Sequence, residues 1–145
     1  MTDPVTALQT GAISRTYLDP EGRKLGKAKT LGSPAGIVRL SRDEDVLEGL
    51  RLAEGLESAL SAAAIGLRPV WSTGGKGLLR QFPVLSGIEA LTIIADNDAN
   101  GDGERAAHEV AARWVQAGRE TRIIVWAGIG DINDAITEAD DGLEP

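Results

Sequence analysis

The chain of 145 residues contains no cysteine and only one histidine. These absences exclude a disulfide framework and a thiolate metal site, and they leave too few ligands for a zinc site. Aromatic residues are also scarce, so alanine, leucine and isoleucine must supply most of the core. No apolar run approaches the ~18 residues that a membrane span needs, and the N-terminus has no basic region followed by an apolar segment. We therefore expect a cytoplasmic protein with no membrane partner.

The net charge of −7 argues at first against nucleic acid as a partner, but the charges are segregated along the chain. Residues 14–42 carry seven basic and two acidic side chains, whereas the chain from residue 43 onward is strongly acidic. A basic surface of this kind can be merely solvated. It can also hold a phosphate backbone beside an acidic site at which a metal offsets the repulsion.

The first 45 residues predict a small basic β appendage. Residues 1–10 have no pattern and predict a loose end. Residues 13–18 and 24–31 are strand-like and flank the turn Asp19-Pro20-Glu21-Gly22, and residues 37–40 offer a third short strand. This segment has little core of its own, so it must pack on the rest of the chain.

Residues 46–145 predict a second unit, an α/β domain in which strands and helices alternate. Strands are expected at 50–53, 69–71, 91–95 and 122–126. Helices are expected at 56–64, up to about residue 82, around 106–115 and after Asp131. This alternation predicts a four-stranded, mainly parallel sheet with helices on both faces, in the strand order second, first, third, fourth.

Carboxylates follow two strands that this order makes neighbours. Asp96 and Asp98 come directly after the strand at 91–95, and Glu54 follows the strand at 50–53. In parallel sheets ligands lie at the carboxyl ends of the strands, where the strand order reverses. Because like charges held together repel unless a cation lies between them, we interpret the three residues as a divalent-metal site.

The aspartates also admit two other interpretations. Asp96-x-Asp98-x-Asn100-Gly101 matches the first half of an EF-hand loop, but Ala107 stands where that loop needs a bidentate glutamate, and a strand precedes it. Alternatively the aspartates merely cap a turn, an interpretation that their place after a buried strand weakens.

The glycine-rich segment Thr73-Gly74-Gly75-Lys76-Gly77 resembles a phosphate-binding loop only in part. Val70 and Gly77 stand where the P-loop requires a glycine and a serine or threonine. A turn that brings Lys76 and backbone N–H groups near an anionic substrate remains open. His108 falls on the polar side of its helix, which favours a solvated residue over a catalytic one.

Together these segments resemble the Toprim domain shared by topoisomerases and primases, over residues 50–136. The resemblance rests on Glu54-Gly55-x-Glu57, on Asp96-x-Asp98-x-x-Gly101, and on Gly130-Asp131-Ile132-Asn133-Asp134. Residues 18–23 are similar to the segment before this domain in primase-helicase proteins of phages, plasmids and mobile elements, which implies that residues 1–45 are part of a preceding primase subdomain. A zinc-binding module, a helicase domain and most of the other primase subdomain have no counterpart here, so the chain looks like an excised domain or a stand-alone relative.

The resemblance implies the site residues and the cofactor. It assigns acid/base catalysis and metal binding to Glu54, and metal binding to Asp96 and Asp98, with Asp102, Glu57 and Asp131 as further ligands. The cofactor implied is Mg²⁺, with Mn²⁺ as a substitute, which agrees with the preference of Mg²⁺ for a few carboxylates and substrate phosphates. The nucleic-acid or phosphate contacts expected are Lys76, Arg15, Arg23, Lys24, Lys27 and Lys29.

The sequence allows three functions. The first is a primase-type nucleotidyltransferase domain for DNA replication, with DNA (including single-stranded DNA), nucleotides, and helicase or other primase domains as partners. The second is a Toprim nuclease with similar carboxylates. The third is a catalytically silent module that binds metal and nucleic acid and depends on other domains.

Overall fold

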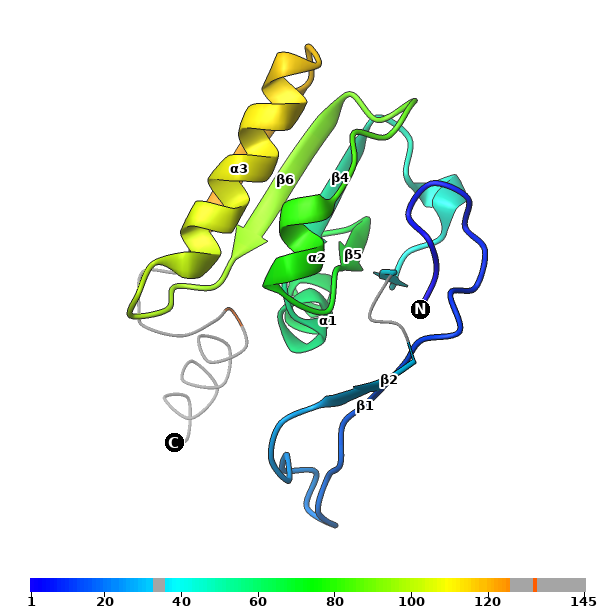
Figure 1. Cartoon of the computed structure of the whole chain (residues 1–145), viewed down its shortest axis with the longest axis vertical. Coiled ribbons are helices and arrows are strands. Elements are labelled where there is room, and N and C mark those ends of the chain that lie inside the picture. Colours follow the sequence, from blue (N-terminus) through cyan, green and yellow to red (C-terminus); the bar gives the residue numbers. More distant parts are fainter. Residues whose placement is uncertain (33–35, 126–131, 133–145) are drawn as a thin grey trace.

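The computed structural model describes residues 1–32, 36–125 and 132. Five strands form the main sheet in the order β3-β5-β4-β6-β7, and Figure 1 shows helices on both of its faces. The elements of this sheet and its helices are β3 (Val38–Arg39), β4 (Gly49–Ala53), α1 (Leu56–Ala64), β5 (Val70–Ser72), α2 (Lys76–Gln81), β6 (Ala90–Ala95), α3 (Asp102–Gln116) and β7 (Glu120–Val125). The predicted α/β fold is confirmed.

The four strands expected from the sequence are present and parallel. β4 pairs with β5 on one side and β6 on the other, and β6 pairs with β7, which is the predicted order. The sheet has five strands rather than four because β3 adds to the edge of β5 in the antiparallel sense. β3 lies within the segment that was predicted to form a separate appendage, so that segment shares the main sheet.

Alternate residues of the central strands pack into two hydrophobic cores, one on each face of the sheet. On one face Leu50 and Leu52 of β4 and Ile93 of β6 pack with α2 and α3 in a cluster that includes Phe82 and Trp114. The rings of Phe82 and Trp114 stack with centroids 6.2 Å apart. On the other face Ala53, Val70 and Ile94 pack against the alanines of α1 in a smaller cluster. The sheet is thus buried on both faces at β4, as its near-continuous apolar strands predict.

Helix α1 presents a different side to the sheet from the one its leucines suggest. Its buried residues are small: Ser58, Ala59, Ser61, Ala62 and Ala63. Leu60, the larger apolar residue next to Ala59, is 51 % exposed. Small side chains let the helix lie close to the sheet, and they place hydroxyl groups at a buried surface.

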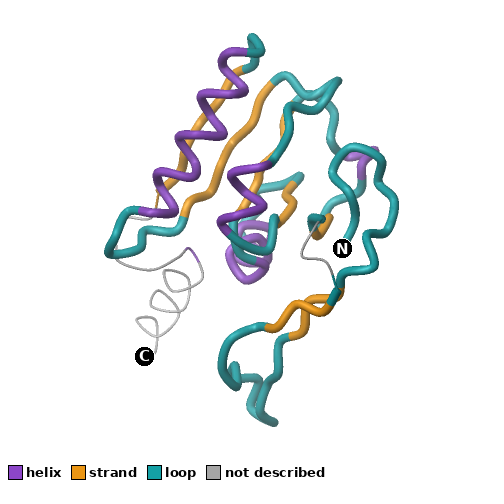
Figure 2. Tube along the Cα trace, viewed as in Figure 1, coloured by secondary structure: helices purple, strands orange, loops and turns teal. Residues whose placement is uncertain are grey.

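The N-terminal hairpin forms where the sequence predicts it. β1 (Ile13–Arg15) and β2 (Lys29–Leu31) pair antiparallel, and the turn at Asp19 is closed by its side chain, which accepts the Arg23 N–H at 2.7 Å. All residues of both strands are exposed. In Figures 1 and 2 the hairpin projects away from the main sheet.

Residues 1–10 are not a loose end, and that prediction is wrong. The Thr2 N–H donates to the Ile37 carbonyl at 2.9 Å, and the Ile37 N–H donates back at 2.7 Å. Arg39 then clamps the segment: its guanidinium donates to the carbonyls of Asp3 and Pro4 and lies 4.6 Å from the ring centroid of Trp71. The sequence does not predict this contact, because the segment is held mainly by backbone hydrogen bonds. Such bonds leave no pattern in the side chains.

The predicted last helix after Asp131 lies outside the described residues, except for Ile132, which packs against the core cluster beneath α1. No helix in the described part of the chain is long and apolar enough to cross a membrane.

Candidate metal centre

The ends of β4 and β6 bring Glu54 and Asp96 to the same edge of the sheet. The strands are parallel and in register, with Ala53 opposite Ile94, so the residues after them leave the sheet side by side. Asp98 lies two residues further on, in the loop before α3. The charges of Asp96 and Asp98 both act on the carboxyl group of Glu54, and a metal site shared by the three side chains stays a prediction.

Glu54 is the buried member of the group. It is only 7 % exposed, and its Oε2 atom has no hydrogen-bond partner among the described residues. Burial, together with the charge of Asp96, raises the pKa of Glu54 to about 7, although the ammonium of Lys76 acts in the opposite direction. The carboxyl group therefore gains or loses a proton near neutral pH, and a second cation beside it would favour the charged form.

Asp96 is positioned by α1. The Ser58 hydroxyl donates to Oδ1 of Asp96 at 3.2 Å, and Ser58 is 1 % exposed. The sequence reasoning missed Ser58. The signal that could have identified it is a serine one turn after Glu54, on the buried side of a helix of small residues.

Asp98 joins the site to α3. Its Oδ1 atom accepts the Asp102 N–H at 2.8 Å, so it satisfies one of the unpaired donors at the start of the helix. Its Oδ2 atom accepts a hydrogen bond from Lys76. The hydrogen bond from Lys76 and those from backbone N–H groups hold the pKa of Asp98 below its ordinary value.

Two cations from α2 neutralise the outer part of the acidic cluster. Arg80 donates to Oδ1 of Asp102 at 2.7 Å, and Lys76 Nζ lies 3.7 Å from Oδ2 of the same residue. Arg80 therefore holds the pKa of Asp102 below its ordinary value. The structure thus places Lys76, which the sequence suggested for phosphate, against Asp98 and Asp102.

Of the remaining predicted ligands, Glu57 pairs with a lysine and Asp131 lies outside the described residues. Glu57 accepts a hydrogen bond from Lys24 of the hairpin at 2.6 Å, and this bond lowers the pKa of Glu57. Among the described residues no three acidic or histidine side chains form a ready-made metal cage, so the ligand roles of these residues stay predictions.

Gly103, in the first turn of α3, is a second residue that the sequence reasoning missed. A Cβ atom at this position would lie 2.6 Å from the carbonyl oxygen of Asp96 and 3.4 Å from Oε2 of Glu54. Only glycine lets the helix start this close to the end of β6. The sequence signal that could have identified Gly103 is a glycine in the first turn of a predicted helix. Glycine lowers helix stability, so its presence there suggests a packing reason.

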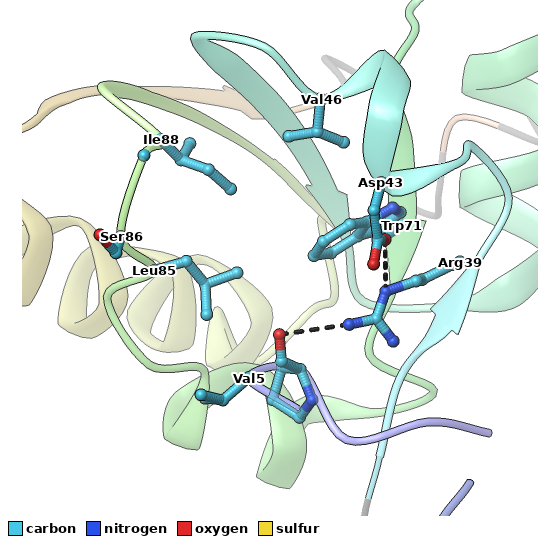
Figure 3. A pocket seen from close by; sticks show the side chains of 10 residues that line it. Val5, Arg39, Asp43, Val46, Trp71, Leu85, Ser86 and Ile88 are labelled. Carbon is cyan, nitrogen blue, oxygen red and sulfur yellow. Dashed lines mark hydrogen bonds and ion pairs between the residues drawn. The ribbon is translucent and has the colours of Figure 1, made fainter. Parts of the chain in front are cut away.

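A separate pocket of about 310 Å³ lies near the opposite end of the strands (Figure 3). It is lined by the N-terminal segment, by Val46 before β4 and by Leu85 and Ile88 before β6. The two charged groups that line it, Arg39 and Asp43, pair with each other at 2.7 Å, and Arg39 also donates to backbone carbonyls. This pocket joins the N-terminal segment to the sheet and is distinct from the acidic centre.

The fold and the site define a class: a Rossmann-like α/β domain with carboxylates gathered where its two central parallel strands end. The chain belongs to the Toprim domain family, whose sequence model matches residues 50–141. The recognition made from the sequence motifs is confirmed.

Its fold is also similar to that of a solved DNA primase domain from Pseudomonas aeruginosa, with a TM-score of 0.55 and 13 % sequence identity. The match covers 98 % of this chain and 54 % of that one, so the chain spans about half the length of the primase domain. No curated protein matches the sequence of the chain.

We expect Gly103→Ala to displace the first turn of α3 from β6, because the new methyl group meets the Asp96 backbone. Overpacking of this kind costs about 1–3 kcal/mol of folding free energy, measured by urea unfolding. Gly77→Ala is the matched control: Gly77 is also the second residue of a helix, but a Cβ there meets nothing within 4 Å. Equal stability changes in the two variants would contradict the close approach at Gly103.

We expect the stability of the metal-free protein to fall as pH rises through the range from 4.5 to about 7, which separates the ordinary pKa of Glu54 from its pKa in the fold. In this window the folded state binds more protons than the unfolded state. The loss from this residue is about 2–3 kcal/mol and is measured by chemical unfolding in EDTA.

Glu54→Gln should remove this part of the pH dependence. Glu48→Gln, at the other end of β4 on an exposed residue, should keep it. A Glu54→Gln protein with the full pH dependence would show that the titration belongs to another group.

Proposed function

We propose that this Toprim domain serves metal-dependent phosphoryl transfer on nucleic acid, as the nucleotidyltransferase domain of a primase-like DNA replication protein. The observation that carries the proposal is the convergence of Glu54 with Asp96 and Asp98 at the ends of two adjacent parallel strands. The family match and the similarity in fold to a primase domain support it.

The residues present fit a divalent cation. Oε2 of Glu54 is buried and without a hydrogen-bond partner in the described structure, and the charges of Asp96 and Asp98 act on the same carboxyl group. Oxygen ligands of this kind suit Mg²⁺, with Mn²⁺ as a substitute. Glu54, Asp96 and Asp98 would hold the ion, and Asp102 would contribute through Oδ2, since Arg80 and Arg105 both contact its Oδ1 atom. When bound, Mg²⁺ neutralises developing charge on the transferring phosphoryl group.

Glu54 also has the properties of a general acid/base. A carboxyl group whose pKa lies near 7 can take a proton at Oε2 from an attacking hydroxyl group and return it at neutral pH. Ser58 holds the neighbouring Asp96 in place, and the start of α3 holds Asp98. These contacts fix the positions of the carboxylates before substrate arrives.

The hairpin supplies a surface for the nucleic acid. Arg15, Lys27 and Lys29 are exposed on it, and Lys24 links it to α1 through Glu57 beside the acidic site. Basic side chains at this place can hold a phosphate backbone that leads to the metal centre. Single-stranded DNA and nucleotides are the substrates proposed.

A specific observation favours a second candidate, a module that binds metal and DNA without turnover by itself. Among the described residues the carboxylates form no ready-made metal cage, and Lys76 is hydrogen-bonded to Asp98. Residues from a helicase or another primase domain would then complete the site. A Toprim-type nuclease is the remaining alternative, and the products formed from single-stranded DNA distinguish all three.

We expect incubation with single-stranded DNA, labelled nucleotides and Mg²⁺ or Mn²⁺ to yield extended products on a denaturing gel. Glu54→Gln should lower the rate by about a hundredfold or more, since it removes the proposed acid/base group. Glu48→Gln should leave the rate unchanged. Shortened DNA would assign nuclease activity, and unchanged DNA with retained binding would assign the silent module; either outcome contradicts the primase proposal.

We expect binding of single-stranded DNA to weaken steeply with salt because of the basic hairpin. Replacing Lys27 and Lys29 together by glutamine should reduce the slope of log K against log salt concentration by about 1.4, which corresponds to two phosphate contacts. Replacing Arg119 and Arg122 together, at β7, is the charge-matched control. Equal effects of the two double variants, measured by fluorescence anisotropy, would mean that the hairpin is not the binding surface.

A further inference from the structure

Lys76 is held where the acidic centre opens to solvent. It is the first residue of α2, and the loop before it is tied to the end of β4, where the Thr73 hydroxyl donates to the Glu54 carbonyl at 3.2 Å. Its ammonium donates to Oδ2 of Asp98 and lies 3.7 Å from Asp102. A cation of the protein thus already lies among the carboxylates.

The hydrogen bonds of Asp98 show which of its two carboxylate oxygens is bonded to Lys76. Oδ1 accepts the N–H of Asp102 at 2.8 Å and so belongs to the start of α3. Oδ2 is the oxygen that faces Lys76. A divalent ion that binds Oδ2 therefore meets the ammonium at short range, and two cations on one carboxylate oxygen repel strongly.

Lys76 can leave without loss of the contact between α2 and α3. Its side chain is 32 % exposed, so a path to solvent is open. Arg80 holds Asp102 at 2.7 Å, and Arg113 donates to the carbonyls of Phe82 and Arg80 at 2.8 and 2.7 Å. These bonds join the two helices independently of Lys76.

We propose that Lys76 is the resident counter-ion of the metal centre: its ammonium occupies Asp98 in the metal-free protein, and a divalent cation must displace it in order to bind. Lys76 then sets the affinity for the metal by competing for the same carboxylate oxygen. This inference rests on the proposed metal centre. It explains why the carboxylates form no ready-made cage among the described residues, because one of them faces a lysine.

The test is Mn²⁺ binding in the absence of nucleic acid and nucleotide, measured by the loss of the free-ion electron paramagnetic resonance signal. Lys76→Met should bind Mn²⁺ about five- to tenfold more tightly than the wild type. Arg105→Met is the matched control, since it removes the same charge from another cation that contacts Asp102 at 3.3 Å but is not bonded to Asp98. This control should change the affinity less than about twofold.

Equal affinities of the wild type and Lys76→Met would overturn the inference. If Asp98→Asn still weakens Mn²⁺ binding in that case, the proposed metal centre is retained and only the proposed role of Lys76 is rejected. If neither the wild type nor Lys76→Met binds Mn²⁺, both the proposed metal centre and the inference about Lys76 are rejected. Tighter binding by both Lys76→Met and Arg105→Met would also overturn it, because the effect would then be one of general charge.

Thermal unfolding separates competition from a merely structural role. In EDTA, Lys76→Met should melt below the wild type, since the carboxylates lose a counter-charge. With saturating Mn²⁺ the rise in Tm should be larger for the variant than for the wild type. A variant that melts lower by the same amount in both conditions would show that Lys76 only stabilises the fold.

Discussion

The main constraint on this structure is the repulsion among carboxylates at one end of a parallel sheet, which the fold has to offset. The pairing of β4 with β6 leaves Glu54 and Asp96 side by side, and the loop after β6 adds Asp98. The repulsion is relieved differently at each residue: Glu54 can hold a proton because its pKa lies near 7, Asp96 accepts a hydrogen bond from a serine hydroxyl, and Asp98 accepts hydrogen bonds from backbone N–H groups and an ammonium. In the proposed function a divalent cation would balance this charge.

The elements around the sheet serve this arrangement through small residues. Ser58 lies on a face of α1 that is otherwise alanine and serine, so the helix approaches the sheet closely. Gly103 lets α3 begin against the backbone of Asp96. The glycine-rich loop before α2 directs Lys76 into the acidic cluster. The scarcity of aromatic residues is consistent with this close packing, because bulky side chains near the site would push the helices away.

The N-terminal part of the chain connects two regions of the protein. Its first residues and β3 complete the edge of the sheet, with Arg39 clamping them over Trp71. Its hairpin extends outward and touches the main domain beside the site through the ion pair between Lys24 and Glu57. An exposed two-stranded hairpin has little stability by itself, which agrees with a segment that contacts further protein or nucleic acid in the proposed function.

Sequence by itself determined the α/β class, the strand order and the positions of Glu54, Asp96 and Asp98, because buried parallel strands are continuous apolar runs and their ends are marked by polar residues. It also predicted the hairpin and its turn from local chemistry. Only the tertiary structure decided that residues 1–10 cross to Ile37 and that Ser58 and Gly103 support the site. It also decided that Lys76 faces Asp98. These features join segments that are distant in sequence through backbone groups, close approach and charge, none of which leaves a periodic pattern in the chain.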